Sequence, residues 1–190
     1  MVWLDGLDIP LISALDASFA EHRPDRGAVP TPRPAGDSLH RWGASMRPAR
    51  LEAQPISNPL FIYPHRQWRA ALATIAVGDS PNAHDGHIME FANPVDGGSV
   101  LATISAFAQL VPAGSRTRSL RSSDGSALVV TEGGSRLFVE EEAFDLQPGD
   151  ICVVPSWKQR RIEADEDLVL FSYWDKAAQQ KLNLWREELL

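Results

Sequence analysis

The stretch that decides the fold runs from Gly114 to Ala164 and reads GSRTRSLRSSDGSALVVTEGGSRLFVEEEAFDLQPGDICVVPSWKQRRIEA. Short runs of β-branched and other apolar residues alternate in it with glycine, proline and acidic turn residues. Short, evenly spaced runs of this kind are typical of the strands of an antiparallel β-sandwich or barrel. The stretch therefore predicts an all-β domain.

The same stretch resembles the paired motif of the cupin superfamily. The first half of that motif is G, five residues, H-x-H, three or four residues, E, six residues and G; the second half is G, five residues, P-x-G, two residues, H, three residues and N. The scaffold positions of the pattern match Gly114, Gly134, Gly149 and Pro155. At the positions of the three histidines and the glutamate the chain has Leu120, Ser122, Ala127 and Arg160.

These four residues do not form a ligand set for a metal ion. Leu120 and Ala127 have no donor atom, and Ser122 offers only a neutral hydroxyl. Arg160 carries a permanent positive charge, which repels a cation. We therefore expect a degenerate metal site, with no metal bound by this chain and no catalytic residue at these positions.

The rest of the chain extends the β pattern. From His87 onward, runs with strand character cover 87–92, 100–110, 116–122, 127–131, 136–139, 143–146, 151–155, 161–164 and 168–174. Apolar spacing predicts helices over 9–20 and 65–75, an amphipathic helix over 177–190, and short strands over 2–4 and 60–63. We expect a cupin jelly-roll (double-stranded β-helix) barrel over 59–176, a strand and helix over 1–22, a proline-rich arm over 23–58 and a C-terminal helix over 177–190.

The composition of the chain limits the classes of partner that we expect for it. The chain has 190 residues, of which 44% are hydrophobic and 23% charged, which suits one principal globular domain. A net charge of -7 disfavours nucleic acid as a partner, and no apolar run is long enough to span a membrane. The N-terminus lacks the features of a signal peptide, so the expected location is the cytoplasm. Cys152 is the only cysteine and is interpreted as a buried small residue.

Two sets of side chains allow more than one interpretation. His84 and His87 flank a turn signal at Gly86, so we interpret them as exposed or capping imidazoles. If the strand alternates regularly, a candidate pocket for a carboxylate would be lined by Arg116, Arg118, Ser122 and Arg160. The plainer interpretation pairs these arginines with acids such as Glu132 or Glu163.

Four segments resemble a specific family. They are MVWLDGLDIPL at 1–11, PISNPLFIYP at 55–64, HDGHIMEFANP at 84–94 and GDICVVPSW at 149–157, and they are similar to the second half of gentisate 1,2-dioxygenases. Members of this bicupin family are often tetrameric enzymes that cleave aromatic rings with iron(II) and dioxygen. The resemblance implies that the iron belongs to a first cupin, which precedes the segment matched here. Trp3 and Asp5 match positions that border the site of that first cupin.

The resemblance leaves three functions open. The first is a structural or oligomerising C-terminal cupin, whose partner is a second copy or a separately encoded iron-bearing N-terminal cupin. The second is a non-catalytic cupin that binds an aromatic carboxylate. The third is an inactive, truncated gene product. The apolar strand expected at Val2 to Leu4 would be an unpaired edge, which favours an oligomer.

Overall fold

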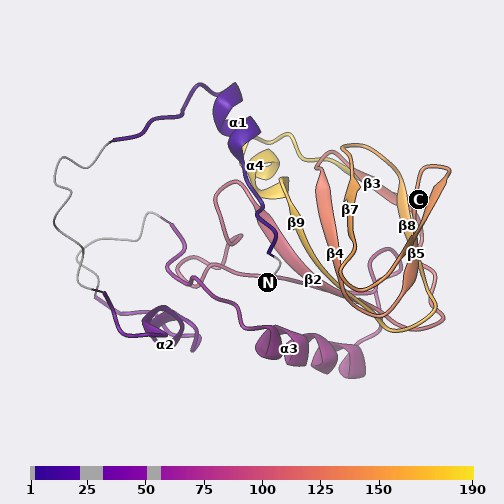
Figure 1. The fold of residues 1–190 in the computed structure, drawn as a ribbon, viewed down its shortest axis with the longest axis horizontal. Helices are drawn as coiled ribbons and strands as arrows, with labels where there is room; N and C mark the ends of the chain where they lie inside the picture. Colours follow the sequence, from indigo (N-terminus) through magenta and orange to yellow (C-terminus); the bar gives the residue numbers. More distant parts are fainter. Residues whose placement is uncertain (1–2, 22–31, 51–56) are drawn as a thin grey trace.

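The computed structural model describes residues 3–21, 32–50 and 57–190. Its strands form two antiparallel five-stranded sheets (Figure 1). The first has the order β1-β2-β9-β4-β7 and consists of His87–Glu90, Ser105–Val111, Leu168–Trp174, Ser126–Glu132 and Ile151–Val154. The second has the order β10-β3-β8-β5-β6 and consists of Glu187–Leu189, Leu120–Ser122, Arg160–Ala164, Ser135–Val139 and Glu142–Leu146. The predicted all-β class is confirmed.

The main core lies between the two sheets. Strands β2 and β9 are buried along almost their whole length, which explains why their sequences are nearly continuous apolar runs. On β4, Leu128 and Val130 point into this core, where they meet Leu137 of β5 and Ile162 of β8. The alternation of inward and outward residues along these strands places every other side chain in the interior.

A second apolar cluster attaches helix α3 to the outer face of the first sheet. The helix spans His65–Gly78 and begins after Pro64. The helix predicted over 65–75 is therefore confirmed, and it extends beyond that range. Its residues Trp68, Leu72 and Ile75 recur at helical spacing and pack against Ala108 and Val169 of the sheet. Figure 1 shows α3 running along this side of the molecule.

The N-terminal segments differ from their prediction. Trp3 and Leu4 are not part of a strand, and Val2 lies outside the described residues. Helix α1 spans only Ile9–Ala14, and the segment 60–63 is irregular rather than a strand. A short helix α2, Asp37–Trp42, forms inside the region predicted as a proline-rich arm, of which 23–31 and 51–56 lie outside the described residues. Backbone pairing along 3–4 is absent, so apolar character alone did not make a strand there.

The C-terminus also differs from its prediction. Helix α4 spans Lys176–Lys181 and is followed by a turn, with Asn183 at a positive φ of 57°. The chain then forms β10, which pairs antiparallel with β3. The ion pair between Arg121 and Glu188 joins the two strands. The single helix predicted over 177–190 is therefore wrong beyond its first turns, while the boundaries proposed for the domains stay a prediction.

Candidate functional site

The positions that carry metal ligands in the cupin pattern lie at one end of the interior. Leu120 on β3 and Arg160 on β8 face each other as direct strand partners. Both side chains are buried. Ser122 lies two residues further along β3 and is half-buried. Three of the four predicted positions are thus brought to two neighbouring strands.

The fourth position is Ser126 rather than Ala127. Ser126 shares its face of β4 with Leu128 and Val130 of the core, whereas Ala127 shares the outer face with its strand partners Val153 and Tyr173. The residues between Ser122 and Ser126 number three, which the motif also allows.

With Ser126 at the fourth position, the glycine that closes the first half of the motif is Gly133 instead of Gly134. Gly133 has a φ of +75°, and a Cβ there would lie 2.2 Å from the carbonyl oxygen of Asp167. Gly134 has neither constraint. Serine at the carboxylate position still supplies no negative charge for a cation.

The buried side chain of Arg160 is held in an ion pair with Asp85, which is half-buried. Its Nη2 donates to Oδ1 of Asp85 at 2.7 Å, and only 4% of the Arg160 side chain is exposed. The guanidinium also lies over the ring of Trp174, with 5.5 Å between its central carbon and the ring centroid. Such a pair needs good geometry and further contacts to offset the loss of hydration of both charges.

Gln109 of β2 supports the acidic partner. Its Nε2 donates to the backbone oxygen of Asp85 at 2.7 Å. Within the described residues, Nη1 of Arg160 and Oε1 of Gln109 are buried without a hydrogen-bond partner. The polar network at this end of the interior therefore joins β2, β8 and the loop that carries Asp85.

Of the two acids expected beside the arginines, Glu163 does pair with Arg116, with 3.8 Å between Oε1 and Nε, whereas Glu132 binds elsewhere. Glu132 accepts hydrogen bonds from Arg69 of α3 and lies 3.7 Å from His65. Glu163 also accepts a hydrogen bond from Arg161, and this bond holds the pKa of the carboxyl below its ordinary value. An internal acid does pair with Arg160, as the plainer interpretation expected, but that acid is Asp85 and not Glu132 or Glu163.

The loop that supplies Asp85 is packed against the barrel. Nδ1 of His84 lies 3.0 Å from the carbonyl oxygen of Ser119, and the backbone N–H of Arg118 donates to the carbonyl of Ala83. His84 and His87 are both buried, so of the two alternatives, exposed or capping imidazoles, the exposed one is wrong. Gly86 has a φ of +70°, and a Cβ there would lie 2.6 Å from the carbonyl oxygen of Leu110, so both the backbone conformation and the close approach require glycine.

The two histidines of this loop do not converge. His87 pairs with Leu110, and directly paired residues share a face of the sheet. That face carries Ala106, Ala108 and Leu110, which pack toward α3. His84 instead contacts the chain before β3. The structure separates the histidines onto two sides of the first sheet.

Arg116 and Arg118 are exposed instead of lining the interior. Regular pairing in β3 begins only at Leu120, and Arg116 forms an isolated bridge with Glu163. Thr117 is the buried residue of this segment, and its backbone N–H and side-chain oxygen both bond to Ile162. The alternation assumed for 116–122 is broken, so the four side chains of the candidate carboxylate pocket do not converge.

The remaining predicted residues lie away from this interior. Trp3 is 78% exposed, and Asp5 is exposed as well. Cys152 shares its face of β7 with the buried Val154 and is half-buried rather than fully buried. Burial raises the pKa of the Cys152 thiol, which keeps it protonated and weakly nucleophilic.

The donor set does not suit a cation. In the ranges 3–21, 32–50 and 57–190, no group of three or more His, Cys, Asp or Glu side chains is placed to hold a metal ion. At the motif positions, Leu120 offers no donor, and Arg160 brings a positive charge. The residues present therefore do not fit the iron that the fold family implies. The described helices also include none with the length and apolar character required to cross a membrane.

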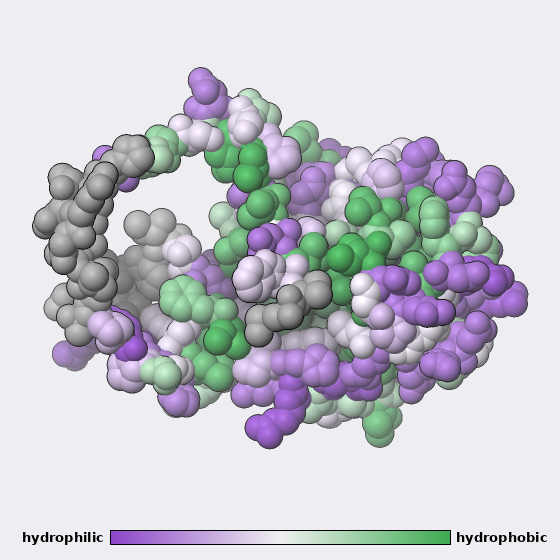
Figure 2. Space-filling model, viewed as in Figure 1, coloured by the Kyte–Doolittle hydropathy of each residue, from purple (hydrophilic) through white to green (hydrophobic). Residues whose placement is uncertain are grey.

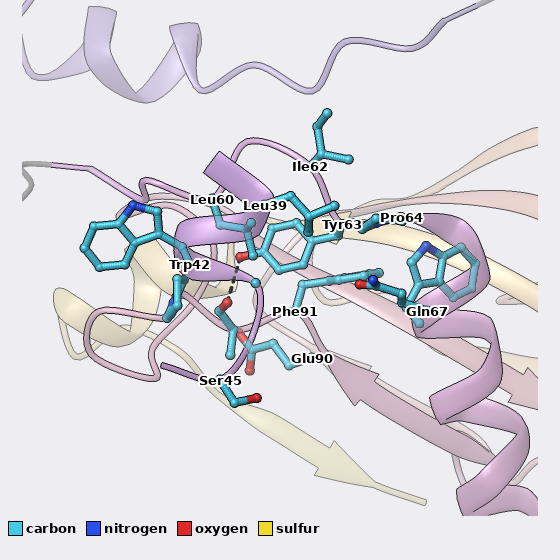
Figure 3. Close-up of a pocket in the computed structure, with 14 residues that line it drawn as sticks. Leu39, Trp42, Ser45, Leu60, Ile62, Tyr63, Pro64, Gln67, Glu90 and Phe91 are labelled. Carbon is cyan, nitrogen blue, oxygen red and sulfur yellow. Dashed lines mark hydrogen bonds between the residues drawn. The ribbon is translucent and has the colours of Figure 1, made fainter. Parts of the chain in front are cut away.

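An aromatic hollow of about 320 Å³ lies outside the barrel, between α2 and β1. Figure 3 shows Tyr63 beside Phe91 in it, with Trp42 to one side. The Tyr63 hydroxyl accepts from Asn58 and donates to the carbonyl of Ala92, and burial raises the pKa of Tyr63. The rings of Tyr63 and Phe91 pack edge to face, with centroids 5.3 Å apart. Residues of the N-terminal segments and residues of the barrel line this hollow together.

Comparison with known proteins matches nearly the whole chain. It is 41% identical over 187 residues to gentisate 1,2 dioxygenase 1 of Aquipseudomonas alcaligenes, covering 98% of this chain and 54% of that protein. It is 33% identical to 5-aminosalicylate 1,2-dioxygenase of Comamonas sp, covering 99% of this chain and 50% of that protein. No protein-family model matches the chain.

A solved structure agrees in fold. The salicylate 1,2-dioxygenase of Pseudaminobacter salicylatoxidans superposes with a TM-score of 0.83 at 24% identity, over 96% of this chain and 53% of that one. The predicted cupin fold is thereby confirmed. The chain spans about half the length of the relatives it matches. The chain is therefore a member, by homology, of the gentisate 1,2-dioxygenase family, and it corresponds to about half of a family member, consistent with the C-terminal cupin.

Proposed function

We propose that this chain is a metal-free supporting cupin related to ring-cleaving dioxygenases, and that it contributes structure rather than chemistry. The observation that carries the proposal is the ion pair of the buried Arg160 with the half-buried Asp85 at the place of a ligand histidine. Bringing a divalent cation to this place would require the guanidinium to leave, since Arg160 is charged at all physiological pH values. Asp85 would then lose the partner that offsets its own burial.

The neighbouring positions support the same proposal. Leu120, opposite Arg160, adds apolar volume where a ligand histidine would need space. Ser126 is a hydroxyl at the carboxylate position, and its strand partner Trp174 lies under the guanidinium. Together these residues fill the interior with a packed and largely paired set of side chains. The names of the relatives, gentisate and 5-aminosalicylate dioxygenases, connect the supported chemistry to aromatic carboxylates.

In this proposal, dioxygenase activity requires a separate iron-bearing cupin. The chain's own residues would then act by packing against that domain and by keeping their interior closed. Arg160 holds the loop of 82–87 onto the barrel through Asp85. This is a positioning role, because Arg160 binds the side chain of Asp85, whose backbone oxygen is also held by Gln109.

Oxygen uptake tests the proposal. The purified full chain, supplied with iron(II) and either gentisate or salicylate, should consume no oxygen above the rate without protein. Adding a separately expressed iron-bearing cupin half of a family member should leave the rate per iron equal to or higher than that of the half alone. Substrate-dependent oxygen uptake by this chain alone would overturn the proposal.

A further inference from the structure

We infer that a hollow beside α2 binds a nucleotide, with arginine side chains on the phosphate and an exposed aromatic ring under the base. We call it the arginine hollow. It has a volume of about 380 Å³, which is within the range of small-molecule sites. The inference goes beyond the supporting role proposed above, because none of the residues that line the hollow belongs to the two sheets. Three arginines, one carboxylate and two aromatic rings define it: Arg33, Arg41, Arg50, Asp37, Trp42 and Phe61.

Positive charge is concentrated in the segment that supplies the hollow. The chain has a net charge of -7, yet its sequence over 23–50 contains six arginines, no lysine and two aspartates. Three of these arginines, Arg33, Arg41 and Arg50, line the hollow. A local surplus of guanidinium groups in an acidic chain attracts an anion to that place.

A single carboxylate faces these arginines. Among the described residues that line the hollow, Asp37 is the one acid. It accepts a 2.9 Å hydrogen bond from Nη2 of Arg41 and lies 3.5 Å from Nη1 of Arg33. The hydrogen bond from Arg41 lowers the pKa of Asp37, so the carboxylate is charged at neutral pH. Each guanidinium has five N–H donors, so both arginines keep donors for an external anion.

An exposed aromatic ring lines the same hollow. Phe61 is 81% exposed, whereas Trp42 is buried behind the surface. Figure 2 shows hydrophilic and hydrophobic surface adjoining over the part of the molecule that carries α2 in Figure 1. Bases stack on exposed aromatic side chains, and each such stack contributes about 1–3 kcal/mol. The Phe61 ring is therefore suited to hold the flat part of a ligand whose anionic part meets the arginines.

Hydrogen bonds tie the walls of the hollow together. The hydroxyl of Ser38 on α2 donates to the carbonyl of Pro59 at 2.7 Å and accepts from the backbone N–H of Phe61 at 2.9 Å. These bonds hold the backbone of Phe61 against the helix that carries Arg41. A site whose parts are held in place before the ligand arrives loses less free energy to ordering on binding.

A nucleotide is the ligand class that matches both features. Guanidinium groups bind phosphate through two parallel hydrogen bonds, and a phosphate monoester carries close to two negative charges at neutral pH. That charge suits three arginines and one aspartate better than the single charge of a carboxylate. Free phosphate would leave the Phe61 ring without a contact, and a nucleoside would bring no anion to the arginines. A mononucleotide supplies both parts.

Isothermal titration calorimetry of the full chain tests the inference with four probes: adenosine 5′-monophosphate (AMP), adenosine, inorganic phosphate and salicylate. The wild-type protein should bind AMP with a dissociation constant on the order of 100 µM. Adenosine and inorganic phosphate should each bind at least roughly 10-fold more weakly, because each lacks one of the two contacts. Phosphate or salicylate that binds as tightly as AMP would overturn the nucleotide assignment, and so would the absence of AMP binding at millimolar concentration.

Two variants separate the two parts of the hollow. Arg41→Gln removes a charged donor and leaves Asp37 to repel the phosphate, so the dissociation constant for AMP should rise roughly 50-fold while that for adenosine stays unchanged. Phe61→Leu should weaken AMP and adenosine by the same factor, roughly 10-fold, and leave inorganic phosphate unaffected.

Arg116→Gln is the matched control. It removes one exposed arginine that does not line the hollow, so AMP binding should stay unchanged. Circular dichroism of each variant checks that it is folded. Equal weakening of AMP binding by Arg41→Gln and Arg116→Gln would contradict the inference. The metal-free proposal is tested separately, because Arg160 and Asp85 are unchanged in every one of these variants.

Discussion

The interior around β8 and the hollow beside α2 use arginine in opposite ways. Inside, Arg160 and Asp85 form an ion pair where apolar residues are the rule. In the arginine hollow, Arg33 and Arg41 share the single carboxylate of Asp37. One region therefore pairs its charges one to one, and the other carries an excess of positive charge. In the function proposed above, the ion pair of Arg160 and Asp85 occupies the place of a metal ligand.

The comparison separates an arginine that has its own acidic partner from arginines that share one. At the positions of metal ligands in the cupin pattern, Arg160 pairs with Asp85 and Leu120 is buried opposite it. In the inference above, a phosphate balances the excess charge beside α2. The predictions below test each side of this contrast.

The largest effect is expected from Arg160→Ala. The change leaves the carboxylate of Asp85 without its charged partner and opens a cavity beside Trp174, which should cost about 3 kcal/mol of unfolding free energy. Urea denaturation followed by fluorescence measures the loss. Arg116→Ala is the control, because that side chain is 78% exposed, and its effect should stay within about 0.5 kcal/mol.

The double variant Arg160→Met with Asp85→Asn tests whether the loss of stability in Arg160→Ala comes from the broken ion pair or from the lost side-chain volume. Removing both charges while keeping most of the side-chain volume should restore much of the stability lost in Arg160→Ala. A double variant as unstable as Arg160→Ala would show that the charge pairing of Arg160 and Asp85 is not the source of the effect.

The arginine hollow gives the next effect. Arg41→Gln and Arg116→Gln both remove one positive charge from an exposed arginine, but only Arg41 lines the hollow. The dissociation constant for AMP, measured by calorimetry, should therefore rise roughly 50-fold in the first variant and stay unchanged in the second. Equal responses of the two variants would remove the distinction between the hollow and the rest of the surface.

The register of β4 predicts a smaller effect at a pair of glycines. Gly133→Ala places a Cβ against the carbonyl of Asp167 at a φ of +75°, and should cost roughly 2 kcal/mol. Gly134→Ala meets nothing closer than 3.7 Å and should cost less than about 1 kcal/mol. Thermal unfolding of the two variants measures the difference. If Gly134→Ala were the more harmful change, Ser126 would not occupy the interior position.

The half-buried pair of Arg161 and Glu163 provides the smallest effect. Arg161 holds the pKa of Glu163 below its ordinary value of 4.5, so the pair stabilises the fold above that pH. The stabilisation is lost as the pH falls through the lowered pKa of the folded state. Wild type should therefore lose its advantage over Glu163→Gln on acidification, as measured by urea midpoints at neutral and acidic pH. An advantage that is independent of pH would exclude the charge as its cause.

Much of the fold follows from local sequence. All nine β runs expected after His87 contain a strand, because their apolar residues recur at the period of a sheet that is buried on at least one face. The errors lie in the segments before His87 and at the C-terminus. Leu182 and Trp185 fit a helical period, yet the chain turns at Asn183 and pairs β10 with β3. Tertiary pairing decided the structure of that segment.

The site was only partly predictable. The loss of ligand residue types at Leu120 and Arg160 is visible in the sequence. The partner of Arg160 is not, because Asp85 lies 75 positions away in a segment that reads as an exposed turn. The choice between Ser126 and Ala127 also required the register of β4, since the motif permits both spacings.

Iron content is the most direct measurement of the central claim. The full chain is incubated anaerobically with iron(II), desalted, and analysed for metal per chain by plasma mass spectrometry. If Arg160 and Asp85 occupy the place of a metal, the protein will retain no stoichiometric iron. Retention of close to one iron per chain, lost on replacement of residues in this interior, would contradict the account.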